Sequence, residues 1–370
     1  MSSTMNKMDS TKIRVGIIGL GFGGESALKS YKRLSNVEVV ALAGLEEDRL
    51  AFLGKTYEVP HLYRDYKDLL QHEGLDALSI AVPNSLHAPI AVAAFERGLH
   101  VLCEKPLART SEEAETMVQA ATKANRVLRV VYNHRERNDI QFLKRYITEG
   151  NLGTIYYAKA YWMRRRGIPG TGSWFVNKQI AGGGPLIDLG VHVLDIALFL
   201  LDEPAVKSVT ASTYNELGSQ GIGFDLNAGK SGSNSKFEVE DLATAFIRLA
   251  SGTTLLLETS WATHSSAQDD YGIVLYGTQG GADIRTQKSP TGYTTTDTLT
   301  IYTNVAGVPT KISPHIQGGE FHAAVIRDFI DIITSGNWSL HNGSDGLRRA
   351  RIIDACYTSA LQGREVILES

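Results

Sequence analysis

A regular alternation of short apolar runs with amphipathic helical stretches dominates the first third of the chain. Five of the apolar runs read as buried strands, and they cover residues 13–19, 37–43, 77–82, 100–104 and 127–132. Parallel strands need crossover helices, which cover both faces of the sheet. The alternation therefore predicts an α/β fold whose first domain, residues 11–133, is a doubly wound parallel sheet.

After one more predicted helix, residues 139–149, the pattern changes to longer runs that alternate polar and apolar residues. This β-rich region predicts a second domain, residues 134–370, with one large open and mainly antiparallel sheet. One face of such a sheet must be covered by helices or by another subunit, so we expect a homodimer or homotetramer that forms through it. Two C-terminal helices, expected at residues 320–335 and 343–362, are available to pack back on the first domain.

Composition narrows the class of partner. The formal net charge is −3 and no run of basic residues occurs, so we expect neither nucleic acid nor a membrane surface as a partner, but a small molecule. Cys103 and Cys356 are the two cysteines and lack metal-site or disulfide-framework spacing, and we expect no metal. The longest apolar stretch, residues 191–201, is interrupted by His192 and Asp195 and is too short to span a bilayer. With no apolar run of signal-peptide length in the first twelve residues, we expect a cytoplasmic protein.

A glycine-rich turn follows the first predicted strand and precedes a helix. Its residues are Gly19, Leu20, Gly21, Phe22, Gly23 and Gly24. In a Gly-x-Gly-x-x-Gly turn the first glycine makes the tight turn, the second lets the backbone approach a pyrophosphate, and the third allows close helix packing. The position of the turn favours dinucleotide binding over a purely structural turn.

The end of the second strand bears on the choice between NAD and NADP. An acidic residue that binds the adenosine ribose is expected here, but the chain has Gly44, followed by Glu46 and Glu47. Carboxylates near this point would repel a 2'-phosphate, which slightly favours NAD. Arg49 could instead swing towards such a phosphate, and acidic residues also suit an exposed helix start.

Two further strands end in segments that should face the cofactor. Pro83, Asn84 and His87 follow one strand, and Glu104 and Lys105 lie at the end of the next. Ligands of doubly wound sheets bind at the carboxyl ends of the strands. An ammonium group at Lys105 would stabilise an alkoxide that develops on a reacting alcohol, although a lone lysine at a strand end is often merely exposed.

A second constellation follows the run from Gly182 to Pro185, which suits a helix start. Asp188 and His192 fall at i and i+4, on one face of the predicted helix. The histidine can exchange a hydroxyl proton while the aspartate orients its ring, and Asp195 is a candidate for further support. Structural hydrogen bonds inside a buried helix, or a metal pair, are the alternatives.

Together, the glycine turn, Pro83-Asn84-x-x-His87, the Glu-Lys-Pro segment at 104–106 and Asp188-x-x-x-His192 resemble the glucose-fructose oxidoreductase and inositol dehydrogenase family, Gfo/Idh/MocA. The resemblance extends over nearly the whole chain. It implies an N-terminal Rossmann domain and a C-terminal domain with an open sheet. It also implies an active site that acts on a sugar or cyclitol, with Lys105, Asp188 and His192 as its catalytic residues. The family often has an acidic residue in place of Gly44, so this departure bears on cofactor preference.

Weaker candidates for substrate contacts lie near the domain junction, and they are Asn133, His134, Arg164, Arg165 and Trp174. The expected activity is NAD(P)-dependent hydride transfer between a secondary alcohol of a sugar or inositol-like cyclitol and the nicotinamide. An NAD-dependent glycosidase that oxidises its substrate transiently and a non-catalytic NAD(P)-binding regulator are the alternatives. The substrate, its stereochemistry and the direction of the reaction stay open at this point.

Overall fold

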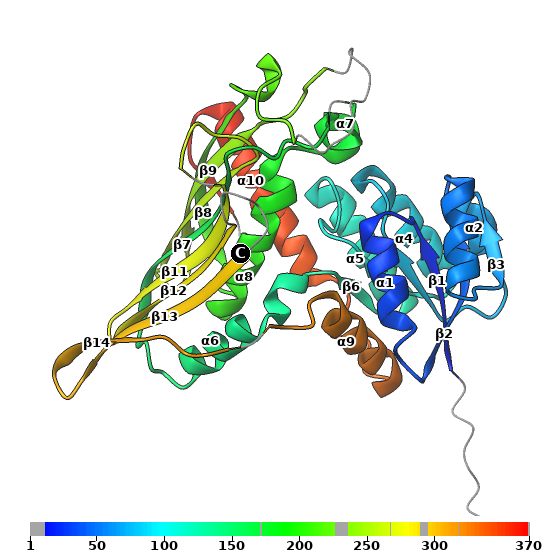
Figure 1. Cartoon of the computed structure of the whole chain (residues 1–370), viewed down its shortest axis with the longest axis horizontal. Coiled ribbons are helices and arrows are strands. Elements are labelled where there is room, and N and C mark those ends of the chain that lie inside the picture. The colour runs from blue at the N-terminus through cyan, green and yellow to red at the C-terminus, as the bar shows by residue number, and fades with distance from the viewer. Residues whose placement is uncertain are drawn as a thin grey trace, which may run out of the picture.

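The chain folds into two α/β bodies that lie side by side, each built on its own sheet (Figure 1). A computed structural model describes residues 12–170, 172–225, 236–266, 268–288, 295–316 and 318–368. The first sheet has six strands and the second has nine.

The first sheet is parallel throughout, with strand order β3-β2-β1-β4-β5-β6. Its strands are β1 (Ile13–Ile18), β2 (Val37–Ala43), β3 (His61–Tyr63), β4 (Ala77–Ile80), β5 (His100–Cys103) and β6 (Leu128–Val130). The helices between them are α1 (Phe22–Tyr31), α2 (Glu47–Thr56), α3 (Tyr66–Leu70), α4 (His87–Glu96) and α5 (Ser111–Ala124). The doubly wound sheet predicted from the sequence is confirmed. The strand order reverses between β1 and β4, which is where such sheets form a ligand crevice.

The second sheet is antiparallel except for one pair, β10 with β7. Its order is β14-β13-β12-β11-β7-β10-β9-β8-β15. The strands are β7 (Ile155–Arg164), β8 (Val206–Tyr214), β9 (Leu242–Leu249), β10 (Thr254–Ser260), β11 (Asp269–Gly277), β12 (Gly280–Lys288), β13 (Thr295–Val305), β14 (Val308–Ile312) and β15 (Val366–Ile367). The large, mainly antiparallel sheet predicted for this region is confirmed.

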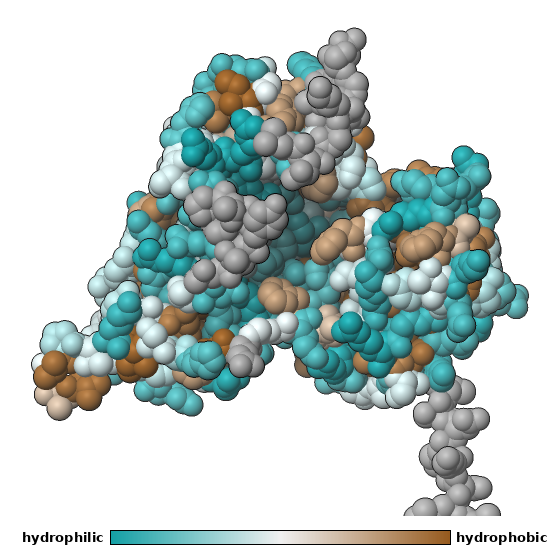
Figure 2. Space-filling model, viewed as in Figure 1, coloured by the Kyte–Doolittle hydropathy of each residue, from teal (hydrophilic) through white to brown (hydrophobic). Residues whose placement is uncertain are grey.

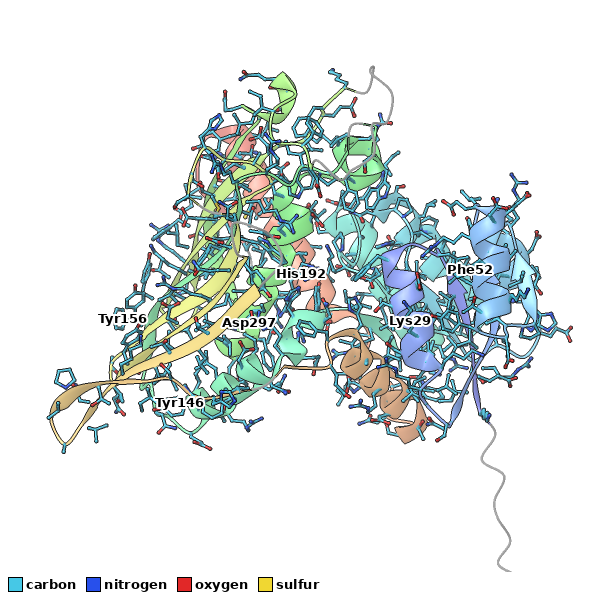
Figure 3. All side chains as sticks on the ribbon, in the orientation of Figure 1. Lys29, Phe52, Tyr146, Tyr156, His192 and Asp297 are labelled. Atoms are coloured by element: carbon cyan, nitrogen blue, oxygen red, sulfur yellow. The ribbon has the colours of Figure 1, made fainter. Side chains whose placement is uncertain are left out.

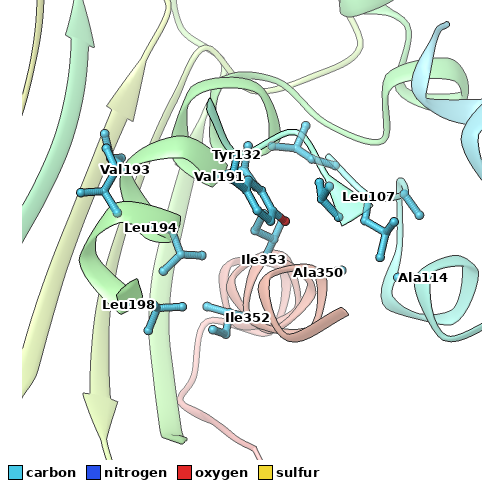
Figure 4. Close-up of a cluster of buried hydrophobic side chains, with 14 of the residues drawn as sticks. Leu107, Ala114, Tyr132, Val191, Val193, Leu194, Leu198, Ala350, Ile352 and Ile353 are labelled. Carbon is cyan, nitrogen blue, oxygen red and sulfur yellow. The ribbon is translucent and has the colours of Figure 1, made fainter. Parts of the chain in front are cut away.

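Helices cover one face of the second sheet. The helices on the sheet are α8 (Val191–Leu200) and α10 (Ser344–Gln362), and α6 (Asn138–Thr148) packs against α8. Figure 4 shows α10 between α8 and α5, with Leu194 and Leu198 of α8 beside Ile352 of α10. These side chains are at most 1% exposed, so one continuous apolar core joins the two bodies.

The last but one helix, α9 (His322–Ser335), packs on the first body. Val325 and Phe329 of α9 share a buried cluster with Leu28 and Tyr31 of α1. A helix from the C-terminal region therefore covers part of the N-terminal sheet.

The segment Lys178–Leu200 meets the length and composition of a membrane span, with a mean hydropathy of 1.6. However, 89% of its most apolar window is buried inside the structure. It contains α7 (Lys178–Ala181), a π-helical turn (Leu186–Gly190) and α8. The burial is that of a core helix, which explains the apolar composition.

Candidate active site

A cavity of about 1240 Å³ lies between the two bodies, at the carboxyl ends of the first sheet. Figure 2 shows the surface hollowed between the two bodies. The cavity brings together most of the candidate residues from both domains, namely Gly19, Leu20, Gly21, Phe22, Gly23, Gly44, Glu46, Pro83, Asn84, Glu104, Lys105, Asn133, His134, Arg164, Trp174, Asp188 and His192. Gly24, His87 and Arg165 are not part of its lining.

The glycine turn has the shape that a dinucleotide requires. Gly19 has a positive φ of 88°, and a Cβ there would clash with the carbonyl of Ala81. A Cβ at Gly24 would clash with the Gly19 carbonyl, so this glycine serves helix packing. Around Gly21, by contrast, no atom lies within 4 Å of the Cβ position, so its backbone is open to the cavity. The turn therefore fits a pyrophosphate.

The side chain of Leu20 packs against Gly44, where an acidic residue was expected. A Cβ on Gly44 would lie 2.7 Å from Leu20 Cδ1, so leucine fills the space that a side chain at 44 would need. Glu46 lines the cavity beside it. Arg49 donates to the backbone carbonyl of Leu20 and, at 2.6 Å, to Glu25. In this structure Arg49 supports the glycine turn.

The segment after β4 joins the two bodies. Asn84 donates from Nδ2 to the Ala181 carbonyl at 2.8 Å and lines the cavity. The predicted cofactor contact by His87 is wrong, because this side chain is fully buried away from the cavity. Its ring nitrogens lie 2.8 and 2.9 Å from the carbonyl oxygens of Pro106 and Val82. His87 thus connects the two strand-end segments beneath the site.

Lys105 and Asp188 form an ion pair across the domain junction. Lys105 Nζ lies 2.9 Å from Asp188 Oδ1 and 3.0 Å from the Asp188 backbone carbonyl. The second carboxylate oxygen, Oδ2, accepts from Trp261 Nε1 at 3.0 Å. Asp188 lies in the π-helical turn, a rare element that is frequent at functional sites.

The predicted pairing of Asp188 with His192 is wrong. Both carboxylate oxygens of Asp188 are engaged by Lys105 and Trp261, and His192 Nδ1 is buried without a hydrogen-bond partner. A π-helical turn holds one residue more than an α-helical turn, so side chains at i and i+4 no longer lie above one another. The His192 ring instead packs 4.6 Å from His134 and 5.7 Å from Trp162, centroid to centroid.

Burial and nearby cations set the charge of these groups. Burial, followed by the positive charge of Lys105, holds the pKa of His192 well below its usual range. Burial and then Arg137 lower the pKa of His134 to about 3. The pKa of Asp188 is also lowered: burial raises it, but Lys105 and then Arg164 outweigh that effect. At neutral pH the site thus contains neutral imidazoles beside a carboxylate and an ammonium group.

Asp195 does not support His192, contrary to the expectation from sequence. It is fully buried and accepts hydrogen bonds from Arg135 at 2.8 Å and from Arg349 Nε at 3.0 Å. These contacts join α8 to α10 and to the segment after β6. The role of Asp195 is structural.

The weaker candidates occupy different parts of the cavity. Asn133 Nδ2 lies 3.3 Å from His322 Nδ1, and Arg164 donates to Asp269 at 2.9 Å. The Trp174 ring stacks on Phe175 at 3.9 Å between centroids. Arg165 lies outside the lining, so the structure does not support it as a substrate contact.

Several residues in or beside the cavity were not singled out from the sequence as site residues. Trp162 and Tyr271 stack at 4.3 Å and flank His134, which Phe321 also approaches. His322, at the start of α9, lies 3.6 Å from Glu104 and lines the cavity. The position of Trp162 near the end of a strand was a usable signal. Among the described residues, no cluster of metal-ligating side chains occurs.

Comparisons with known proteins agree with this arrangement. The Gfo/Idh/MocA profile described as "Oxidoreductase family, NAD-binding Rossmann fold" matches residues 13–132, and the profile of the family's C-terminal domain matches residues 140–283. D-glucoside 3-dehydrogenase of Escherichia coli K12 is 33% identical over 365 residues, which cover 98% of this chain and 99% of that protein.

Levoglucosan dehydrogenase of Pseudarthrobacter phenanthrenivorans is 29% identical, over 94% of this chain and 96% of that protein. A solved levoglucosan dehydrogenase in complex with NADH and L-sorbose has a TM-score of 0.83 and 25% identity, covering 97% of this chain and 100% of that chain. Two matching profiles, near full-length similarity and a shared fold establish that the chain belongs to the Gfo/Idh/MocA family of NAD-binding oxidoreductases.

Proposed function

We propose that the protein is an NAD-preferring dehydrogenase that oxidises a secondary alcohol of a sugar. The observation that carries the proposal is the position of His192, which lines the same cavity as the glycine turn, Lys105 and Asp188. Burial and the nearby positive charges keep its imidazole neutral there. Figure 3 shows His192 between the second sheet and the first body.

His192 acts as the proton acceptor in this proposal. Its Nδ1 is buried, which leaves Nε2 as the ring nitrogen for a substrate hydroxyl. A neutral imidazole can take the hydroxyl proton, and the nicotinamide cofactor, when bound, supplies the hydride acceptor. Lys105 has a third N–H beyond the two contacts with Asp188, and it can donate to the oxygen as negative charge develops there.

Asp188 has a different role from the one expected from the sequence. Because its carboxylate contacts Lys105 and not His192, it orients the ammonium group and balances its charge. Substrate orientation falls to the polar and aromatic residues that line the cavity around His192. These are Asn133, His134, Trp162, Arg164 and Trp174.

The proposed preference for NAD rests on the end of β2. Glu46 lines the cavity there, and a 2'-phosphate near a carboxylate would be repelled. Arg49 donates hydrogen bonds to Leu20 and Glu25, so in this structure it does not point towards the site of a 2'-phosphate. Arg64, which also lines the cavity, pairs with Glu47 at 2.6 Å.

The relatives support a sugar as the substrate. Their names describe dehydrogenases of D-glucosides and levoglucosan, and the solved complex contains NADH and L-sorbose. We therefore place glucosides and anhydro sugars ahead of cyclitols as candidate substrates.

A substrate screen tests the proposal. Glucosides, anhydro sugars, free aldoses and inositols are offered with NAD and NADP in parallel, and the absorbance of the reduced cofactor is recorded. We expect turnover with at least one sugar, faster with NAD, and a loss of about 10²- to 10⁴-fold in His192→Ala with NADH affinity retained. Full activity of that variant at every pH would refute the role of His192.

We also propose that the open face of the second sheet forms a subunit interface. Tyr156, Tyr276 and Tyr302 are 55%, 42% and 47% exposed. Figure 3 shows Tyr156 pointing away from the covering helices. Native mass spectrometry is expected to show a homodimer or homotetramer that Tyr276→Glu weakens, and a wild-type monomer at all concentrations would contradict this.

A further inference from the structure

The contact between Trp261 and Asp188 links the second sheet to the proposed catalytic pair. Trp261 follows β10 directly and is fully buried, and its backbone N–H donates to the Asp241 carbonyl at 2.9 Å. Its indole N–H donates to Asp188 Oδ2 at 3.0 Å. Trp261 is not part of the cavity lining. It therefore acts on the site only through a residue that is.

In this contact Trp261 is the donor and Asp188 is the acceptor. An indole N–H is a donor only, so its buried partner must be an acceptor. Asp188 meets this need with one oxygen and uses the other for Lys105. Because each oxygen has its own donor, the carboxylate is fixed in rotation, and so is the direction from which it holds the ammonium group.

We infer that Trp261 is a positioning residue, which fixes the Asp188 carboxylate so that it holds Lys105 beside the reacting hydroxyl. The inference rests on the proposed function for the role of Lys105. Lys105 comes from the end of β5 in the first body, and Trp261 comes from the end of β10 in the second. Through Asp188, Trp261 at the end of a strand in the second body thus helps to fix the position of Lys105, which belongs to the first body.

The ionisation of Asp188 depends on the same contact. Burial raises the pKa of Asp188, but the charged groups that face it, Lys105 after β5 and Arg164 at the end of β7, outweigh burial and favour the carboxylate. The Trp261 hydrogen bond also lowers the pKa of Asp188. Its loss raises that pKa, so the acid limb of the pH profile moves to higher pH.

Trp261→Phe tests the inference, since it keeps an aromatic ring and removes the N–H. We expect a kcat about tenfold lower, a KM for the sugar within about twofold, and an acid limb of kcat/KM at higher pH. The matched control is Trp338→Phe. Trp338 Nε1 donates to the Ile333 carbonyl at the end of α9, away from the cavity, so this variant should keep the wild-type kcat and pH profile.

A double-variant comparison separates positioning from packing. In the background of Asp188→Ala, Trp261→Phe should cause no further loss of kcat, because the carboxylate on which it acts is gone. An equal loss in both backgrounds would overturn the inference. If phenylalanine unfolds the sheet, benzothienylalanine at position 261 keeps the two-ring shape without the N–H and replaces it in every comparison.

A readout without turnover keeps the inference independent of the proposed function. With isotope-labelled tryptophan, the indole N–H resonance of Trp261, assigned by its loss in Trp261→Phe, should shift in Asp188→Ala more than the other indole resonances. An unmoved resonance would refute the contact. A shifted resonance in a protein that oxidises no sugar would refute the proposed function while leaving the contact intact.

Discussion

One helical segment, Leu186–Gly190 with Val191–Leu200, takes part in two clusters of ionisable groups that differ in how they are paired. We call the part from Leu186 to His192 its cavity end and the part from Val193 to Leu200, which contains Asp195, its core end. At the core end, Asp195 lies between two arginines that bind its oxygens from both sides. At the cavity end, His192 keeps a buried Nδ1 with no partner, and the nearby His134 Nδ1 is also unpaired. Both ends are buried and rich in ionisable groups.

The difference shows what separates a structural cluster from a functional one. Burying a polar atom without a partner costs roughly 1–3 kcal/mol, so unpaired atoms are rare where only stability matters. At the cavity end two imidazoles carry this cost, whereas at the core end both carboxylate oxygens of Asp195 have hydrogen-bond partners. Substitutions at the two ends should therefore affect different properties.

The largest expected effect is on stability at the core end. Asp195→Ala leaves Arg135 and Arg349 buried without their shared carboxylate and should lower the free energy of unfolding by about 3–5 kcal/mol. Urea denaturation measures this change. An Asp195→Ala protein of wild-type stability would break the comparison, because it would show that the core end does not depend on the pairing.

At the cavity end we expect the reverse result from Asp188→Asn. This change removes the charge that holds Lys105 and should reduce kcat about 10²-fold, or about 2.7 kcal/mol of transition-state stabilisation. Steady-state kinetics and urea denaturation are measured on the same sample. If turnover stays high while stability falls, then Asp188 belongs with Asp195 as a structural residue.

The neutral histidines of the cavity end predict a pH dependence of stability. The pKa of His134 is about 3 in the folded chain against about 6.5 when unfolded, so the stability it contributes is complete above pH 6.5 and is lost as the pH falls towards 3. His134→Gln should reduce the loss of unfolding free energy between about pH 7 and pH 4.5 by about 1–2 kcal/mol. Urea denaturation of both proteins at several pH values measures this difference.

The smallest effect concerns the start of the segment. Glu240 accepts from the backbone N–H groups of Gly184 and Leu186, and Tyr357 donates to its Oε1 at 2.9 Å. Tyr357→Phe should lower the free energy of unfolding by about 1 kcal/mol and change kcat by less than about twofold. Thermal melts of this variant and of Tyr156→Phe, a control at an exposed position, measure the difference. A large drop in kcat would show that the start of the segment contributes to catalysis and not only to stability.

The first sheet was readable from the sequence because its strands are buried on both faces and form short apolar runs. β3 is the exception, since two of its three residues are exposed and no apolar run marks it. β12 to β14 were not identified either, because threonine, glycine and charged residues interrupt their apolar pattern.

The sequence was enough to predict which residues form the candidate site, but not which of them contact one another. The motifs identified Lys105, Asp188 and His192, and the fold places them in one cavity. The π-helical turn was not predictable, because one extra residue in a single turn leaves the local hydrophobic pattern almost unchanged. Trp261 was missed because it contacts Asp188 across 73 residues of sequence, and no local spacing connects them.

The packing of α9 has a consequence for the order of synthesis. Chains leave the ribosome from the N-terminus, at about 5–20 residues per second, and domains generally fold as they emerge. Leu28 and Tyr31, on the helix that follows the glycine turn, meet their partners Val325 and Phe329 only when nearly the whole chain has been made. The first body to emerge is thus among the last to complete its core, and a nascent chain must keep that apolar face from aggregating while the second body is synthesised.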